Sequence, residues 1–401
     1  LIFTHSEHEN SMSRPDTVNS RLIAALNNTG GPNNNLTWNI FDSSQNSETL
    51  KNYILGSEDS VHQAKLSIFD LLYEGQINDA NYVVGFQAGS ESLDVTWNDL
   101  ARVEFDADGK MTKSADLLFL GGGSNVNSDR EKYAIFSEFY PQIGNDLDLK
   151  ISARFEKIGD ESSFDPKISL KKYVNNNLIL RGSLGTSFAM PSLGQLYSAN
   201  TSLGNVSGIF IRVSKVGDPD LKPQSSTNSN FGIIYLYEDR KISLDYWQID
   251  YKDRLTVESA KTLYAANSNN PIFTYDSSGV LFAANVSYIN EEKTDLSGID
   301  FSFESGKYDS SFGQFDYKIN GTYLLKYETT QGGSSIERAG RFNNDIDGYS
   351  LPEYKVNLFA LMEKNLNKYT FNARYVSGYD NHKKLLTRAI SVGGYTNKVD
   401  S

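Results

Sequence analysis

The sequence predicts an all-β chain folded as a transmembrane, antiparallel, up-and-down β-barrel. Three observations lead to this prediction. Apolar and polar residues alternate in many short segments, which is the spacing of strands. Short turns and long loops alternate along the chain, as they do in a barrel with all its turns at one end. The 24 tyrosines and 22 phenylalanines are many for a chain of mean hydropathy −0.45, and aromatic girdles at two membrane interfaces would use them.

The alternation is clearest from Leu178 to Phe188, where even-numbered residues share one face and odd-numbered residues, including Arg181, share the other. About thirteen strands are predicted in total from this kind of pattern. The clearest predicted strands are residues 62–75, 82–93, 133–140, 147–155, 167–173, 178–188, 227–237, 241–253, 296–304, 312–326, 351–362 and 370–379.

The connections between these strands are of two kinds. Short turns are predicted near residues 78–81, 141–145, 174–177, 238–240, 307–311 and 364–367. Long connections are predicted at residues 14–61, 93–130, 189–225, 253–295 and 327–350, and the short segment 158–163 is the exception among them. A soluble β-sandwich has no reason to sort its connections in this way, whereas an outer-membrane barrel places turns and loops at opposite ends.

Two local features interrupt the strand pattern. Ser47 is a candidate N-cap, and Leu50, Tyr53 and Ile54 follow it with helical spacing, which predicts a short helix inside a long loop. Further along, residues 218–223 read Asp-Pro-Asp-Leu-Lys-Pro. Two prolines four positions apart cannot lie inside a paired strand, so this corner is predicted to be ordered backbone outside the sheet.

The strand that ends at Phe188 and the proline corner together resemble the barrel signature of TonB-dependent outer-membrane receptors. That family has a strand ending in Phe-Arg-Ala-Pro-Ser-Leu, followed after a loop by Asn-Pro-Asp-Leu-Lys-Pro-Glu and another strand. The matching residues are Phe188, Pro191, Ser192, Leu193, Tyr197, Pro219, Asp220, Leu221, Lys222, Pro223, Thr227 and Asn228. The chain departs from the pattern at Ala189, Met190 and Gln224. Because the usual Arg and Glu are both missing, a possible charge pair inside the barrel is lost.

Similarity to the family extends to further stretches, at residues 13–22, 119–123, 243–247, 249–254, 298–300 and 351–355. The resemblance implies that residues 1–401 belong to one barrel domain, of 22 strands when complete. Leu1 is not a natural start, so we expect an internal part of a longer protein that lacks the N-terminal plug and the closing strands.

Composition excludes several classes of protein. No apolar run is long enough for a transmembrane helix, although strands of a barrel escape this criterion. The net charge of −12 and the lack of clustered Lys and Arg argue against nucleic-acid binding. The chain has no cysteine, so disulfides and thiolate metal sites are unavailable.

Several motifs could suggest other chemistry, and each has a simpler interpretation. His5 and His8 could indicate a metal pair, but residues three apart point to opposite faces of a strand. Residues 105–110 begin like a calcium loop, yet Leu117 stands where the bidentate Glu is required. Residues 121–123 are three glycines without a phosphate-loop Lys, which favours a hinge or close backbone approach. The acids Glu291, Glu292, Asp345 and Asp347 are predicted to be solvated in surface loops rather than a glycosidase pair.

Charged residues within the predicted strands are expected to line a water-filled lumen, because Lys or Arg facing lipid costs about 2–4 kcal/mol at midplane. These residues are Arg154, Lys167, Arg181, Asp245, Asp250, Asp300, Lys318 and Arg374. The loops carry aromatic residues that could stack on a sugar or a catecholate, or could equally pack the loops on one another. These candidates are Tyr197, Phe210, Tyr264, Phe273 and Tyr275.

The resemblance implies an active transporter in the outer membrane of a Gram-negative cell that imports a scarce nutrient such as a ferric siderophore. The implied partners are the TonB energy-coupling complex, acting through the missing plug, and outer-membrane lipid, and the receptor is expected to be a monomer. No cofactor, metal or enzymatic activity is expected. Two alternatives stay open: a passive outer-membrane channel, and a secreted β-rich protein that binds glycan.

Overall fold

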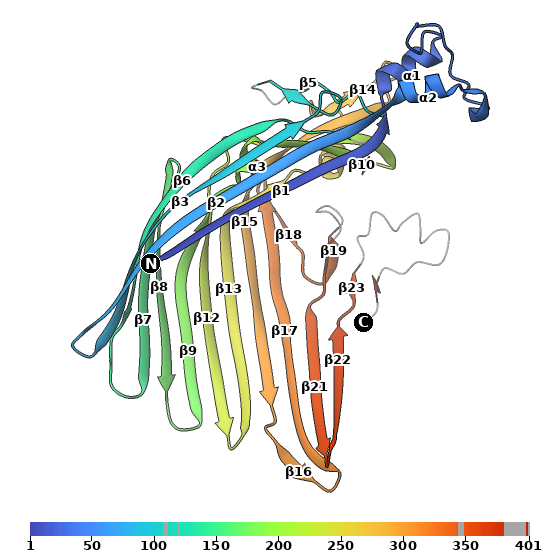
Figure 1. The fold of residues 1–401 in the computed structure, drawn as a ribbon. Helices are drawn as coiled ribbons and strands as arrows, with labels where there is room; N and C mark the ends of the chain where they lie inside the picture. Colours follow the sequence, from blue (N-terminus) through green and yellow to red (C-terminus); the bar gives the residue numbers. More distant parts are fainter. Residues whose placement is uncertain (107–110, 119–120, 344–348, 381–397, 400–401) are drawn as a thin grey trace.

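The computed structural model describes residues 1–106, 111–118, 121–343, 349–380 and 398–399 (Figure 1). Thirteen long strands of this described part follow one another as an antiparallel meander, which we call the wall. The wall strands are β1 (Ile2–Thr17), β2 (Leu55–Ile77), β3 (Ala80–Trp97), β6 (Val126–Tyr140), β7 (Leu147–Ile158), β8 (Glu161–Tyr173), β9 (Leu178–Ala189), β12 (Gln224–Tyr237), β13 (Arg240–Val257), β15 (Leu281–Glu304), β17 (Gly313–Gln331), β21 (Tyr354–Lys364) and β22 (Asn367–Val376). The predicted all-β, up-and-down architecture is confirmed.

Shorter elements lie in the connections. The strands are β4 (Glu104–Phe105), β5 (Met111–Lys113), β10 (Ala199–Val206), β11 (Ile209–Val216), β14 (Phe273–Tyr275), β16 (Tyr308–Ser310), β18 (Ser334–Glu337), β19 (Arg341–Asn343), β20 (Tyr349–Leu351), β23 (Tyr379–Asp380) and β24 (Lys398–Val399). The helices are α1 (Asn19–Leu26), η1 (Ser43–Gln45), α2 (Glu48–Ile54), α3 (Leu193–Tyr197) and α4 (Ala260–Ala266). Among the described residues, no helix is long and apolar enough to cross a membrane.

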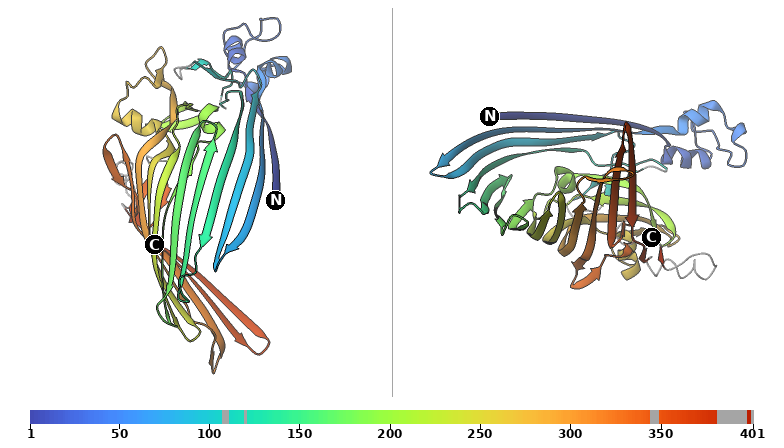
Figure 2. Two further views of the ribbon diagram at one scale, coloured as in Figure 1. Left: turned by 90° about the vertical axis from the view of Figure 1, so that its left-hand side faces the viewer. Right: turned by 90° about the horizontal axis from the view of Figure 1, so that it is seen from below.

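The two kinds of connection lie at opposite ends of the wall, as predicted (Figure 1). The tight turns contain residues in the left-handed region, with φ of 52° at Asn78, 51° at Glu238 and 54° at Asn365. The helices and most of the short strands gather at the other end, where α1 and α2 project beyond the strand ends, whereas β16 lies at the turn end (Figure 1). Seen from below, the strands curve into a wall rather than a flat sheet (Figure 2). In the described part of the chain no pairing joins β22 to β1, so the wall is open.

Several wall strands extend further into the predicted loops than expected. The predicted connection 14–61 contains the ends of β1 and β2, and the predicted connection 253–295 contains much of β15. At the ends of β1 and β2 the physical reason is that both faces are polar: Arg14 pairs with Glu58 at 2.7 Å on one face, and Ser13 Oγ donates to Asp59 Oδ1 at 2.6 Å on the other. Alternation of apolar and polar residues therefore cannot mark these strand segments.

The helix predicted after Ser47 is confirmed as α2, whose Leu50 N–H donates to Ser47 Oγ at 3.3 Å. Helices α1, α3 and α4 were not predicted.

The outer face of the wall is apolar. Ile233, Leu244 and Phe301 are register partners on β12, β13 and β15, and Leu244 is 50% exposed. Toward the tight turns this band ends in aromatic residues that include Tyr235, Tyr237 and Tyr308. Toward the loops the apolar band ends in a second set of aromatic residues. This set includes Tyr246 and the stacked pair Tyr323 and Tyr354, whose ring centroids are 4.4 Å apart. An apolar band between two aromatic girdles is the surface of a strand wall that crosses a membrane.

The fully buried apolar residues are concentrated at the loop end instead. One cluster contains Val206, Ile211, Phe273, Leu281 and Val286. Others join the ends of β1 to β6 with the connections above them. The long connections therefore have a packed interior of their own, while the inner face of the wall borders a polar space.

Candidate functional site

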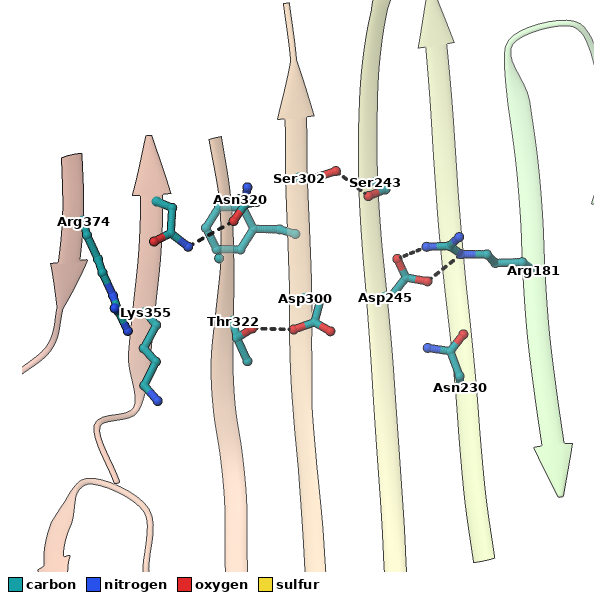
Figure 3. Close-up of a pocket in the computed structure, with 13 residues that line it drawn as sticks. Arg181, Asn230, Ser243, Asp245, Asp300, Ser302, Asn320, Thr322, Lys355 and Arg374 are labelled. Atoms are coloured by element: carbon teal, nitrogen blue, oxygen red, sulfur yellow. Dashed lines mark hydrogen bonds and ion pairs between the residues drawn. The ribbon is translucent and has the colours of Figure 1, made fainter. Parts of the chain in front are cut away.

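The inner face of the wall carries a cavity of about 920 Å³ lined mainly by polar side chains (Figure 3). One row of register partners crosses six neighbouring strands at this level. It runs Arg181, Gly232, Asp245, Asp300, Thr322 and Lys355. A second row, one pleat further along, runs Ser243, Ser302, Asn320, Asn357 and Arg374. Because strand faces alternate, the positions between these rows belong to the apolar outer face.

Arg181 and Asp245 form the strongest contact in this cavity, although β12 separates their strands. Arg181 Nε donates to Asp245 Oδ1 at 2.7 Å, and an Nη donates to Oδ2 at 2.5 Å. Such bidentate pairs are stronger than neutral hydrogen bonds and fix the geometry of both groups. The pair exists because Gly232 lies between them: a Cβ there would be 1.9 Å from Asp245 Oδ1 and 3.0 Å from Arg181 Nε.

Replacing Gly232 with Ala should therefore separate Arg181 from Asp245 and leave a nearly buried carboxylate without its partner. Losing one partner of a buried pair lowers the free energy of unfolding by about 3–5 kcal/mol. Because Arg181 is partly exposed, we expect a smaller loss of about 2–3 kcal/mol for Gly232→Ala. The measurement is urea unfolding of the refolded barrel in lipid. Gly182→Ala is the matched control, because its Cβ would lie 3.4 Å from Asn230 O. Equal losses for the two variants would contradict the role of Gly232.

The remaining polar residues of the cavity form neutral or single contacts. Thr322 Oγ1 donates to Asp300 Oδ1 at 2.7 Å, and Ser243 Oγ lies 2.8 Å from Ser302 Oγ. Asn357 donates to Asn320 at 3.1 Å on the next pair of strands. Lys355 and Arg374 lie close together beyond these (Figure 3) and have no ion-pair partner among the described residues. The cavity can therefore hold water or a polar peptide, but it is a poor site for an apolar ligand.

Most of the charged residues that were predicted to line the lumen are on this inner face. Arg154 donates to Gln87 at 2.8 Å and stacks over Phe136, while Lys318 pairs with Glu304 at 2.8 Å. The register also places Lys167, Arg181, Asp245, Asp300 and Arg374 there. The prediction is wrong for Asp250. Its register partner Thr227 shares a face with Phe231, so Asp250 lies on the outer face, beyond the apolar band, where Gln248 donates to it at 2.9 Å.

The two signature segments meet at the loop end of the wall. Phe188 is near the end of β9, Pro191 and Leu193 are buried, and Leu193 begins α3, which ends at Tyr197. Gly217 N–H donates to Ser198 O at 2.8 Å, and Asp218 N–H donates to Gln195 O at 3.0 Å, which places the proline corner against α3.

Asn290 on β15 fixes the other end of the proline corner, which comprises Pro219, Asp220, Leu221, Lys222 and Pro223. Its side chain accepts from Lys222 N–H and donates to Lys222 O, both at 2.9 Å, and it also donates to Asp253 O at 2.8 Å. Asn228, after the corner, donates to Ser187 Oγ at 2.9 Å on β9. These contacts join the proline corner to β13 and β15, and Asn228 to β9. Sequence reasoning missed Asn290, because nothing local distinguishes it from a loop asparagine.

Two departures from the signature occupy one cross-strand pair. Ala189 on β9 is the register partner of Gln224 on β12. The usual Arg and Glu would therefore face each other across the inner face, as the suggested charge pair requires. Here Gln224 instead accepts from Leu255 N–H at 3.1 Å, so the cross-strand pair of Ala189 and Gln224 carries no charge.

The loop aromatics divide into packed and exposed residues. Phe273 is 7% exposed, and Tyr264 packs against it edge-on with ring centroids 5.2 Å apart. Tyr275 hydrogen-bonds Ser268 O. Tyr197 lines a cavity of about 480 Å³ beside Asp218, and Phe210 is 69% exposed beside a smaller cavity. Packing of the loops on one another accounts for Tyr264 and Phe273, while Tyr197 and Phe210 face open space.

The other motifs are mostly structural. Glu291 was predicted to be a solvated loop residue, which is wrong: it lies in β15, is 6% exposed and pairs with Arg254 at 2.8 Å. Burial is possible because Arg254 is its register partner on β13. Within the described residues, no three His, Cys, Asp or Glu side chains could together hold a metal ion. Residues 107–110 of the calcium-like segment, with Asp345 and Asp347, lie outside the described part.

A single antiparallel wall with an apolar outer face, a polar inner face and sorted connections defines a membrane-spanning β-barrel. The chain matches the TonB dependent receptor-like β-barrel family over residues 4–397 and belongs to this family. The resemblance seen in the sequence is therefore confirmed.

Individual relatives agree with this assignment. The chain is similar to a probable TonB-dependent siderophore receptor, PirA, of Acinetobacter baumannii, with 22% identity over 280 residues that cover 66% of this chain and 35% of PirA. The crystal structure of PirA from the same organism has a TM-score of 0.57 and 15% identity, covering 94% of this chain and 48% of PirA. A variant of the Pseudomonas aeruginosa ferric enterobactin receptor PfeA, in complex with enterobactin, has a TM-score of 0.62 and 14% identity, covering 94% of this chain and 47% of PfeA. The chain thus spans between one third and one half of these relatives.

Proposed function

We propose that this chain is the middle part of an outer-membrane barrel that imports a scarce nutrient of the ferric siderophore class. The observation that carries the proposal is the division of the wall into an apolar outer face and a polar inner face with a cavity of about 920 Å³. Membership of the TonB-dependent receptor family supports active rather than passive transport. The names of the relatives PirA and PfeA support siderophores as the class of nutrient.

In this proposal each end of the wall has a separate role. The long connections face the cell exterior and bind the ligand, and the short turns face the periplasm. A plug outside this chain fills the polar lumen, and the TonB complex moves it to admit the ligand. The chain itself supplies hydrogen-bonding groups and charges and performs no covalent chemistry. Arg181, Asp300, Lys355 and Arg374 are the lumen groups that such a plug would meet.

The test is transport by the full-length protein in a Gram-negative strain that lacks its own siderophore receptors. A panel of radiolabelled ferric siderophores should include at least one that accumulates saturably, and only when TonB is present. Accumulation of small solutes without TonB would contradict the proposal and favour a passive channel. A full-length product that is soluble without detergent would favour the secreted glycan-binding alternative.

A further inference from the structure

We propose that four of the long connections, those after β1, β3, β9 and β13, are joined to one another as a single preformed body, positioned by the glycine segment 121–123 and by the pairing of β11 with β15. We call this body the loop layer; it comprises the described parts of residues 18–54, 98–125, 190–223 and 258–287. It follows that these connections do not close on a ligand as separate lids. This inference goes beyond the proposed function, because it concerns how the loops move relative to one another whatever they bind.

The glycine segment lies at the centre of the loop layer. A Cβ on Gly121 would be 1.7 Å from Thr201 O, one on Gly122 would be 1.8 Å from Ala101 O, and one on Gly123 would be 2.5 Å from the Trp97 ring. Only glycine fits three such approaches in succession. The segment therefore lies directly between the connection that follows β3 and the one that follows β9.

Main-chain hydrogen bonds join these two connections. Thr201 N–H donates to Gly122 O at 2.7 Å, and Ser124 N–H donates to Ala199 O at 3.0 Å. Ala199 N–H in turn donates to Ser124 Oγ at 2.8 Å. Ala199 is also buried in one cluster with Val103 and Ala115. Separating the two connections would expose these donors and an apolar contact at the same time.

The connection after β1 is joined to the same body. Asn19 N–H donates to Asp116 O at 3.0 Å, and Leu118 N–H donates to Thr17 O at 2.9 Å. Asp116 Oδ1 also accepts from Ser20 N–H at 2.7 Å. Arg212 on β11 donates to Leu117 O at 3.1 Å, so residues 116–118 join the connection after β3 to those after β1 and β9.

The connection after β13 is joined through a parallel pairing, an orientation that is uncommon in this largely antiparallel fold. Residues 212–216 of β11 pair in register with residues 283–287 of β15. Val213 and Ala284 are register partners, and both belong to the buried cluster that contains Phe273. Asn290 adds a second junction, through its contacts with Lys222.

A ligand would consequently meet a surface whose geometry exists before binding, and less ordering of loops would oppose association. Movement would be confined to the parts that carry none of these contacts, such as the β10–β11 turn at Ser207 and Gly208, where no atom lies within 4 Å of a Cβ built on Gly208. Independent closure of one connection would require breaking several buried main-chain hydrogen bonds together.

The first experiment compares Gly122→Ala with Gly194→Ala by hydrogen exchange of the refolded full-length protein. A Cβ on Gly194 would meet nothing within 3.8 Å, so that variant is the matched control. For Gly122→Ala we expect exchange at least about tenfold faster at residues 199–201, and also at 116–118 and in the β11–β15 pairing, with β7 and β8 unchanged. Faster exchange confined to residues 98–125 would overturn the proposal, because separate loops would respond separately.

The second experiment does not depend on whether Gly122→Ala folds. The chain has no cysteine, so Val216→Cys with Ser287→Cys gives one defined pair across β11 and β15. Neighbouring strands are close enough for a disulfide. Under mild oxidation the disulfide between the two cysteines should form fully in intact outer membranes. Hydrogen-exchange rates in the rest of the protein should stay within about twofold of those of the reduced protein. Every siderophore that the unmodified protein carries should still be carried after oxidation.

Incomplete cross-linking, or transport that is lost on oxidation and restored by reduction, would overturn the proposal. Single-cysteine variants are the controls. If the unmodified protein carries no siderophore, the proposed function fails, while exchange and cross-linking still decide whether the loop layer is one body.

Discussion

Replacing Leu244 with Arg is expected to destabilise the barrel in lipid by about 2–4 kcal/mol, because Leu244 lies in the middle of the outer apolar band. Its register partners Ile233 and Phe301 are apolar, and Tyr246 and Ile242 flank it along β13. A guanidinium at that depth must either lose its hydration or distort the bilayer so that water reaches it. The measurement is the urea dependence of folding into phospholipid vesicles.

Ser243 provides the matched control, since it is the next residue on the same strand and faces the cavity. Ser243→Arg places the same charge at the same depth on the inner face and should cost at most about 1 kcal/mol, because that face is hydrated. The difference between neighbouring positions separates membrane exposure from general intolerance of strand β13. Similar losses for both variants would mean that the outer face does not meet lipid.

How much of this fold the sequence predicts depends on whether the two faces of a strand meet different surroundings. Where Leu244 faces lipid and Ser243 faces water, alternation is clear and the strand was predicted. Near Arg14 and Glu58 both faces carry polar side chains, so apolar and polar residues do not alternate there, and β2 was predicted to begin too late. Strands β10 and β11 lie within the predicted connection 189–225 and were missed; the buried positions of β10 include the small residues Ala199 and Thr201 rather than an alternating set of large apolar side chains.

Which residues lie on the inner face could be predicted from the alternation of side chains along each strand. The contacts between those residues could not be predicted in this way. Alternation assigned Arg181 and Asp245 to the lumen, but only the register shows that they meet across Gly232. The glycine segment is similar: its composition predicted close approach, while its partners Thr201 and Ala101 depend on tertiary contacts. Asp250 was misplaced because its charge was taken as a sign of the lumen, although beyond the apolar band both faces can carry charge.

Replacing residues 260–279 with a flexible Gly/Ser linker is expected to reduce siderophore uptake by about 100-fold or more, equivalent to about 2.7 kcal/mol or more of lost binding. This segment contains α4, β14 and Tyr275 and pairs with no wall strand other than β15. Deleting the whole predicted connection 253–295 would also remove Arg254, Glu291 and the partner of β11. The linker must span roughly 20 Å. Its first end is near Ser287, because Ser287 O accepts from Glu258 N–H. Its second end is near Leu281, which is six residues before Ser287 on β15, at about 3.3 Å per residue.

The wall should survive this replacement, because its strands contact one another along lengths that the segment never touches. Heat-dependent gel mobility of the full-length protein checks folding, and uptake of the transported ferric siderophore checks function. The control inserts the same linker at Asn365 and Leu366, in the turn at the opposite end of the wall. That variant should transport normally, since the proposed ligand surface is at the loop end. Unchanged uptake after replacement of 260–279 would remove this segment from the ligand surface and leave the exposed residues Tyr197 and Phe210 as the remaining aromatic candidates.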